Sequence, residues 1–293
     1  MHRTAYFAIK FNVNFTRLPL KRENDVTVIV GILCQDGVAI ASDRQITATA
    51  VVPLSQPPTL QTSIAATTKI AVIENDVLLG VSGTPTIGDE YEVVIRKNYS
   101  RFKGGLYENA TRAVQREIRE IINEHIKTAI SLVPLVGQLV AYSQAVCECL
   151  LVANFRDGIK LIQILQHGGF DITKAEMPIK VIGSGQYHAD PFMVFLKNTF
   201  WPQRLPTVQE GILAACWAVD YSIEVGAPMV GRDIDAFTLA PDGRGRIRAR
   251  QMSADQIKDH RGFIAAGRER LRELADLRQA TAQDADQIPT MGK

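Results

Sequence analysis

Residues 27–43 read TVIVGILCQDGVAIASD, and this stretch decides the fold class. Two runs rich in β-branched and small apolar residues flank a turn signal at residues 35–37. The pattern predicts a β-hairpin with two buried strands. In the expected register Asp43 faces Val30, on the strand that starts with Thr27.

A second hairpin is predicted over residues 69–83, because two apolar runs flank a polar Glu-Asn-Asp turn. With the turn centred between residues 75 and 76, Lys69 pairs with Ser82 and lies beside Gly83. One end of one sheet then gathers a hydroxyl, an ammonium, a carboxylate and a backbone N–H group. That set of groups is sufficient for acyl transfer.

The rest of the chain alternates helix pairs with strand pairs. Residues 47–66, rich in Thr, Ser, Pro and Ala, are predicted as a loop. The elements expected after residue 83 are helices at 87–102 and 110–127, strands at 148–155, 159–165 and 179–185, helices at 189–197 and 208–223, and strands at 234–240 and 245–250. Because no βαβ alternation occurs, this order predicts an α+β fold of two antiparallel sheets, each covered by two helices.

One domain is expected over residues 27–250, followed over 251–293 by a polar amphipathic helix and a tail. Residues 1–26 have no regular pattern and stand apart from this domain. We expect them to be a propeptide, a permanent extension, or sequence upstream of a true start at Val26. In the last case a GTG valine codon is read as an initiating methionine, whose removal leaves Thr27 as the first residue.

Composition argues against several classes of partner. The formal net charge is +2, so no polyanionic partner is expected, and a solvated edge strand accounts for the arginines at 244, 246, 248 and 250. Neither the four cysteines nor the five histidines have metal-ligand spacing. We therefore expect no nucleic acid, no metal and no cofactor.

Residues 128–147 carry no charged side chain over about the length of a membrane span. Pro134, Gly137 and several polar residues interrupt this stretch, so a buried helix or a subunit contact is favoured over a span. The N-terminal segment does not have the pattern of a secretion signal. We expect a cytoplasmic protein with reduced thiols and no contact with a membrane.

The stretch from Thr27 to Asp43 resembles the start of a mature catalytic β subunit of the proteasome, in the N-terminal-nucleophile hydrolase family. Further similarity lies at residues 68–70, 81–83, 182–185 and 231–239. The similarity covers most of residues 27–250 and rests on the order and spacing of these pieces. It implies a four-layer αββα sandwich.

The resemblance also implies a role for each of four residues. Thr27 would be the nucleophile, activated by its own α-amine, whose pKa lies near 8 in model peptides. Lys69 would favour the deprotonated hydroxyl by its charge, and Asp43 would hold Lys69 in place. The Gly83 N–H would stabilise the oxyanion of the tetrahedral intermediate.

The chain departs from the family pattern in two places. A serine commonly follows the Gly-Ser-Gly turn, but Gln186 stands there, and residues 226–232 have no counterpart of the usual Asp and Ser. Ser184 and Gln186 are therefore secondary candidates near the terminal amine. Glu224 and Asp233 are secondary candidates for a substitute carboxylate.

Each candidate also has a purely structural interpretation. Thr27 suits an ordinary strand, Asp43 a turn, and Lys69 a strand edge, while glycines such as Gly83 often end strands for steric reasons. The leading hypothesis is a threonine-type peptidase or amidase that cleaves peptides or unfolded proteins inside a homo-oligomeric ring, with an unfoldase partner that the sequence does not identify. The alternatives are an inactive scaffold subunit and a small-substrate amide hydrolase of the same superfamily.

Overall fold

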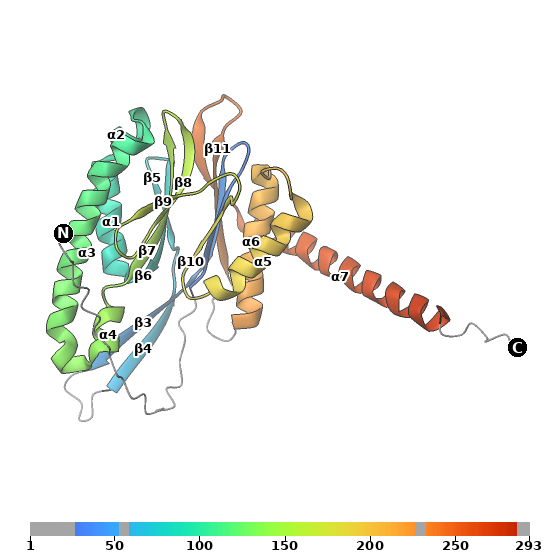
Figure 1. Ribbon diagram of the computed structural model, residues 1–293, viewed down its shortest axis with the longest axis horizontal. Coiled ribbons are helices and arrows are strands. Elements are labelled where there is room, and N and C mark those ends of the chain that lie inside the picture. Colours follow the sequence, from blue (N-terminus) through green and yellow to red (C-terminus); the bar gives the residue numbers. More distant parts are fainter. Residues whose placement is uncertain (1–26, 53–58, 227–232, 286–293) are drawn as a thin grey trace, which may run out of the picture.

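The computed structural model describes residues 27–52, 59–226 and 233–285 of the chain. Two five-stranded antiparallel sheets pack face to face, and helices cover both outer faces (Figure 1). The predicted α+β class and the four-layer αββα sandwich are confirmed. The predicted extension at 1–26, the departure at 227–232 and the end of the tail at 286–293 lie outside the described residues.

The first sheet has the strand order β10-β1-β2-β11-β12, and all neighbours are antiparallel. Its strands are β1 (Ile29–Leu33), β2 (Val38–Asp43), β10 (Ile179–Ile182), β11 (Ile234–Pro241) and β12 (Ile247–Gln251). The first predicted hairpin, β1–β2, forms the centre of this sheet. Its two strands therefore have neighbours on both sides, which agrees with their nearly continuous apolar sequence.

The second sheet has the strand order β5-β6-β7-β8-β9. Its strands are β5 (Ile70–Ile73), β6 (Val77–Gly83), β7 (Cys147–Phe155), β8 (Gly158–Ile164) and β9 (Phe170–Ile172). The second predicted hairpin, β5–β6, lies at one edge. β5 is short, so β6 extends past it at the end where Gly83 lies.

Seven helices occur in the described part of the chain. They are α1 (Pro85–Lys97), α2 (Tyr99–Gly104), α3 (Tyr107–Val136), α4 (Gln138–Ser143), α5 (Gln186–Phe200), α6 (Val208–Gly226) and α7 (Ala254–Ala285). The helices between β6 and β7 cover the second sheet, and α5 and α6 cover the first. The last helix, α7, starts against α6 and then runs away from the body (Figure 1).

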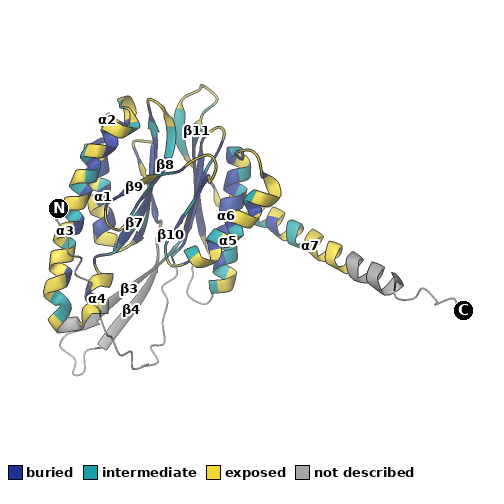
Figure 2. Ribbon diagram, viewed as in Figure 1, coloured by how far each residue is buried: buried dark blue, intermediate teal, exposed yellow. Residues whose placement is uncertain are grey.

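The alternation of side chains along each strand builds two kinds of core. On β1, Ile29 faces the other sheet, whereas Val28 and Val30 pack with residues of α5 and α6. Ile40 and Leu150 join Ile29 between the sheets, where each fully buried side chain contributes about 1.5–3 kcal/mol. Figure 2 shows both sheets as buried and the helices as exposed on their outer sides. The sheets are thus held firmly together, and the ends of their strands are fixed relative to one another.

The prediction of a loop at 47–66 is wrong. β3 (Gln45–Val52) and β4 (Thr59–Ala66) pair along their whole length as a separate two-stranded sheet that projects from the body (Figure 1). The prolines at 57 and 58 favoured a loop, but they fall between the two strands. Threonine, valine and isoleucine dominate the flanking residues, and these types favour strands.

Both predicted hairpin registers are also wrong. In the second hairpin Glu74 and Asn75 adopt left-handed φ angles of 50° and 65°, which gives a three-residue turn and shifts the pairing by one residue. Lys69 consequently lies opposite Val81, whose N–H donates to its carbonyl at 2.9 Å. In the first hairpin, Asp43 lies opposite Val28, one residue from Thr27.

Candidate active site

Three side chains meet where β1 begins, β2 ends and β5 begins. Lys69 Nζ lies 2.8 Å from each carboxylate oxygen of Asp43 and 3.1 Å from the hydroxyl oxygen of Thr27. Thr27 precedes β1, Asp43 ends β2, and Lys69 comes directly before β5. The packing of the two sheets therefore brings these residues together. One ammonium group bridges a carboxylate and a hydroxyl.

Backbone groups hold Asp43 in one orientation. Its Oδ1 accepts a hydrogen bond from the Val28 N–H at 2.9 Å, and its Oδ2 accepts one from the Gln45 N–H at 3.1 Å. The side chains of Lys69 and Asp43 are 3% and 0% exposed. Each charge therefore depends on the other, because an unpaired buried ion loses much of its solvation free energy without compensation.

Burial and the Asp43 carboxylate shift the pKa of Lys69 in opposite directions. Burial lowers the pKa of the Lys69 ammonium, and the charge and hydrogen bonds of Asp43 oppose this effect without cancelling it. A positive charge 3.1 Å from the Thr27 oxygen favours the deprotonated form of that hydroxyl. The arrangement can thus make a weak nucleophile stronger.

The Gly-Ser-Gly turn after β10 holds the backbone of Thr27. The Thr27 N–H donates to Ser184 Oγ at 3.0 Å, and the Gly185 N–H donates to the Thr27 carbonyl at 2.9 Å. Gly183 has a φ of +95°, and a Cβ atom there would meet the Thr27 carbonyl oxygen at 2.3 Å. Glycine at 183 is therefore required for the turn to approach Thr27. The serine beside the Thr27 nitrogen is Ser184.

Gly83 presents its N–H on the same side as Lys69. The Thr84 N–H donates to the Val146 carbonyl at 2.9 Å, and Gly83 faces Cys147 in the β6–β7 ladder. Bonded and non-bonded pairs alternate in such a ladder, so the Gly83 N–H points away from β7, beyond the first residue of β5. Its φ is +111°, and a Cβ atom would meet the Val146 carbonyl oxygen at 2.3 Å, so only glycine fits.

The other secondary candidates lie elsewhere or form other contacts. Gln186 donates from its side chain to Asp190 on the next turn of α5 at 2.8 Å. Glu224, in the last turn of α6, forms an ion pair with Arg268 of α7. Asp233 is exposed; its carbonyl accepts the Arg44 N–H at 3.0 Å, and its carboxylate has no hydrogen bond or ion pair with a described residue.

The sequence argument missed a second buried carboxylate near this site. Asp235 of β11 lies opposite Ser42 in the sheet and forms an ion pair with Arg44 at 3.4 Å. The Asp235 side chain is 8% exposed, and the Arg44 side chain 41%. The signal was a charged residue at an inward position of an otherwise apolar strand, IDAFTLA, over residues 234–240.

Solved structures match the chain over most of its length. An Anbu (Gly-1) mutant from Hyphomicrobium sp. strain MC1 has a TM-score of 0.57 and 17% identity, covering 91% of this chain and 100% of that one. Anbu (ancestral beta-subunit) from Yersinia bercovieri has a TM-score of 0.55 and 13% identity, with the same coverage. The Anbu complex from Pseudomonas aeruginosa, described as a helical assembly, has a TM-score of 0.56 and 15% identity, covering 84% and 96%. No protein-family model and no curated protein sequence matches the chain.

These neighbours correct the family resemblance. The sequence suggested a catalytic proteasome β subunit, but the matching structures are Anbu proteins, which have a proteasome-like fold and are distinct from that subunit. At 13–17% identity the likeness shows the fold alone. The pieces that carried the resemblance are two hairpins and a glycine turn. They build the common sandwich, so they do not distinguish one family with this fold from another.

Two further observations concern membranes and metals. Among the helices of the described residues, none combines the length and apolar character that crossing a bilayer requires. Within the same described part of the chain, no three His, Cys, Asp or Glu side chains group in a way that could hold a metal ion. The uncharged stretch 128–147 forms the end of α3, all of α4 and the first residue of β7.

Proposed function

We propose that this chain is an amide hydrolase that cleaves peptide bonds with Thr27 as an N-terminal nucleophile. The observation that carries the proposal is the position of Lys69 Nζ, 3.1 Å from the Thr27 hydroxyl and 2.8 Å from both Asp43 oxygens. A buried ion pair is weak evidence for a role in stability. The contact between the Lys69 ammonium and the Thr27 hydroxyl, just before β1, supports a chemical role instead.

The reaction requires that residues 1–26 be absent, because the nitrogen of Thr27 is an amide while they remain attached. A free α-amine would replace that amide beside Ser184, whose Oγ lies 3.0 Å from the nitrogen. The amine would take the hydroxyl proton as Thr27 Oγ1 attacks the carbonyl carbon of the substrate. Lys69 would stabilise the developing negative charge on Oγ1.

The tetrahedral intermediate would place its oxyanion at the Gly83 N–H, a donor of a kind that contributes about 3 kcal/mol to barrier lowering. The amine would then return the proton to the departing amine of the substrate. This step leaves an ester between the acyl group and Thr27. Water, deprotonated by the same α-amine, would attack the ester, release a carboxylic acid and restore Thr27.

We also propose that copies of the chain associate. The stretch at the end of α3 and in α4 exposes Ile130 at 53% and Tyr142 at 38% although it carries no charge, which suits a subunit contact. One neighbour of the same fold, the Anbu complex from Pseudomonas aeruginosa, is described as a helical assembly. In this proposal residues 27–250 form the hydrolase domain, and α7 with the tail forms an appendage at 251–293.

Fluorogenic peptides test the activity. A chain that begins at Thr27 should hydrolyse them, and Thr27→Ala in the same chain should lose at least about 10³-fold in rate. The full chain that retains residues 1–26 should be as inactive as Thr27→Ala. Circular dichroism and light scattering serve as controls for fold and assembly.

The outcomes separate the alternatives. Activity within a few-fold of wild type in Thr27→Ala would contradict the proposed nucleophile. A folded, assembled chain with a free Thr27 and no hydrolysis of any peptide tested would make the inactive scaffold the better interpretation. Hydrolysis of small amides without peptides, by a monomer or dimer, would favour the small-substrate enzyme.

A further inference from the structure

A cavity of about 240 Å³ lies at the opposite end of the first sheet from Thr27. It is formed by the last residues of β11, by β12, and by the starts of α6 and α7. Thr238 of β11 pairs with Ala39 near the start of β2, whereas Asp43 ends that strand beside the Thr27 site. The cavity is therefore separate from the candidate active site. Its volume suits a small molecule, since it holds about eight water volumes of ~30 Å³.

The Thr238 hydroxyl faces the cavity and bonds no other side chain of the described residues. Thr238 is only 7% exposed, and its side chain has no hydrogen bond with any residue that the structure describes. It lines the cavity on the helix side of the sheet. Its oxygen keeps some exposure through the cavity, so a ligand there could reach it. A ligand in the cavity would supply the missing partner.

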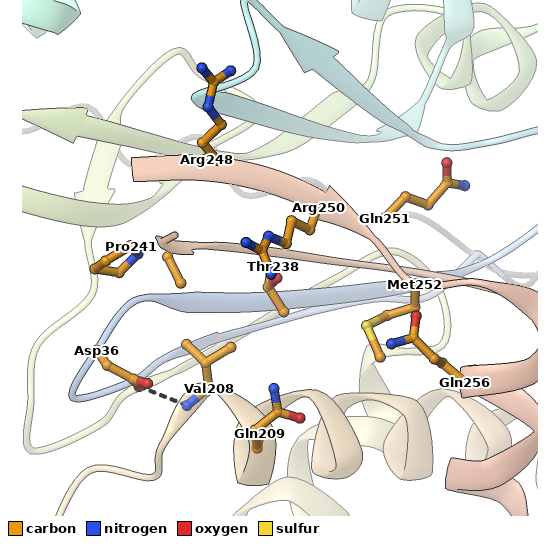
Figure 3. A pocket seen from close by; sticks show the side chains of 11 residues that line it. Asp36, Val208, Gln209, Thr238, Pro241, Arg248, Arg250, Gln251, Met252 and Gln256 are labelled. Carbon is orange, nitrogen blue, oxygen red and sulfur yellow. Dashed lines mark hydrogen bonds between the residues drawn. The ribbon is translucent and has the colours of Figure 1, made fainter. Parts of the chain in front are cut away.

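Arg250 provides a charge at the same place. It lies directly opposite Thr238 in the β11–β12 ladder, and Figure 3 shows its guanidinium group turned toward the Thr238 hydroxyl. Within the described chain Arg250 has no ion pair, whereas Arg248 lies 3.9 Å from Asp242. Arg250 is exposed, and its guanidinium is thus free to bind a ligand at the mouth of this cavity.

The start of α6 supplies the facing wall. Val208 and Gln209 lie in the first turn, where backbone N–H groups have no partner within the helix. The Val208 N–H is already bound by Asp36 Oδ1 at 2.8 Å, as Figure 3 shows. The Arg250 guanidinium on one wall and the Asp36 carboxylate on the facing wall together suit a ligand with one negative charge better than one with two. Val208, Pro241 and Met252 give the cavity apolar surface.

We propose that this cavity is a binding site for a small organic carboxylate. The Arg250 guanidinium would donate two N–H bonds to the carboxylate, a geometry that these two groups favour. The Thr238 hydroxyl would donate a further hydrogen bond to one carboxylate oxygen. The carbon chain of the ligand would contact Val208, Pro241 and Met252. The proposal does not depend on hydrolysis at Thr27.

Isothermal titration calorimetry of the whole chain with three probes tests this site. N-acetylglycine carries a carboxylate, N-acetylglycinamide is its neutral analogue, and inorganic phosphate is an anion of higher charge. We expect saturable, millimolar binding of N-acetylglycine and at least about 10-fold weaker binding of the amide and of phosphate, since a hydrogen bond to a charged group contributes about 1.5–3 kcal/mol.

Variants locate the binding. Arg250→Gln should weaken N-acetylglycine binding at least about 10-fold, and Thr238→Val about 3- to 10-fold. Arg244→Gln is the matched control, because Arg244 lies in the turn between the same two strands but does not line the cavity. It should bind as wild type does. Thr27→Ala should also bind as wild type, which separates this site from the candidate active site.

Three results would overturn the proposal. The first is no saturable binding of N-acetylglycine by the wild-type chain. The second is tighter binding of phosphate than of N-acetylglycine. The third is an affinity within about twofold of wild type in Arg250→Gln when Arg244→Gln is equally unaffected. Thermal melts guard against misfolding, and Thr238→Val should melt close to wild type because the Thr238 hydroxyl bonds no other described residue.

Discussion

The charged side chains at the two ends of the first sheet differ in how far they are buried. At the Thr27 end, Lys69 and Asp43 are 3% and 0% exposed. At the β11–β12 turn, Asp242, whose side chain is 11% exposed, pairs with Arg246 and Arg248, whose side chains are 54% and 43% exposed. Burial of an ion pair carries a large desolvation cost, whereas an exposed pair costs and contributes little. The comparison indicates that the charges at the Thr27 end are held at a cost in stability, as the proposed catalytic role would explain.

The largest expected effect comes from breaking the buried pair. Lys69→Met should lower the free energy of unfolding by about 3–5 kcal/mol, because it leaves Asp43 as an uncompensated buried charge. Urea denaturation of the wild-type and Lys69→Met chains measures this difference in the free energy of unfolding. Lys160→Met is the matched control, since the Lys160–Asp157 pair is 3.3 Å apart and its side chains are 27% and 40% exposed.

The control, Lys160→Met, should lower the free energy of unfolding by less than about 1 kcal/mol. Equal losses in Lys69→Met and Lys160→Met would remove the distinction between buried and exposed pairs. The interpretation of the Thr27 end as a site that retains costly charge would then be wrong.

Gly83→Ala probes the backbone of the same end and should cost about 2 kcal/mol or more in unfolding free energy. The new Cβ atom would meet the Val146 carbonyl oxygen at 2.3 Å, in a residue with a φ of +111°. Gly243→Ala, in the turn at the other end, has no atom within 4 Å of the new Cβ and should change stability little. Thermal denaturation of both variants checks this, and a Gly83→Ala protein as stable as Gly243→Ala would contradict the described backbone.

A buried thiol whose burial outweighs the effect of nearby charges should stay neutral, and Cys216 of α6 tests this. Burial raises the pKa of the Cys216 thiol from its usual 9.0 to about 12. Above pH 9 the unfolded chain therefore loses this proton while the folded chain keeps it, so stability falls as the pH rises. Between pH 8 and pH 10 the loss from this one thiol should be about 1 kcal/mol.

Urea denaturation at several pH values measures that contribution as a difference. Cys216→Ala should lose less stability than wild type over the same pH interval, whatever its stability at pH 8. Identical losses in the two chains would show that Cys216 does not titrate differently on folding.

The smallest effect is expected at the exposed end. Arg246→Gln removes the exposed partner of Asp242 at 3.2 Å. Because the backbone N–H groups of Arg244 and Arg246 still donate to Asp242, the unfolding free energy should change by less than about 0.5 kcal/mol. Addition of salt should reduce even that difference. A loss above about 2 kcal/mol in a thermal or urea melt would show that exposure does not decide the contribution of these pairs.

The fold could be predicted because its signals are local. The apolar runs of β1 and β2, the turns between strands and the helical spacing in α3 and α6 all follow from short-range pattern. The loop prediction at 47–66 failed because its Ser, Pro and Ala content was given more weight than its strand-forming residues. The predicted registers were wrong, by two residues in the first hairpin and by one in the second, because φ angles such as those of Glu74 and Asn75 decide the length of a turn and cannot be read from sequence.

The candidate site could be predicted only in part. Order and spacing pointed to Thr27, Asp43 and Lys69, and the structure brings them together. Asp235 was missed because its ion pair with Arg44 joins β11 to the residue after β2, and these are distant in sequence. The prediction of the family was wrong because hairpins and glycine turns indicate the sandwich fold and do not indicate the chemistry of the site.

The central claim, that Thr27 is a nucleophile poised by Lys69, is tested most directly by intact mass spectrometry. A chain that begins at Thr27 is incubated with a peptide epoxyketone, which reacts with a hydroxyl and a neighbouring α-amine together. The account predicts one adduct per chain, located on Thr27 by peptide mapping, and none on Thr27→Ala or on a chain that retains residues 1–26. A folded chain with a free Thr27 and an unchanged mass would contradict it.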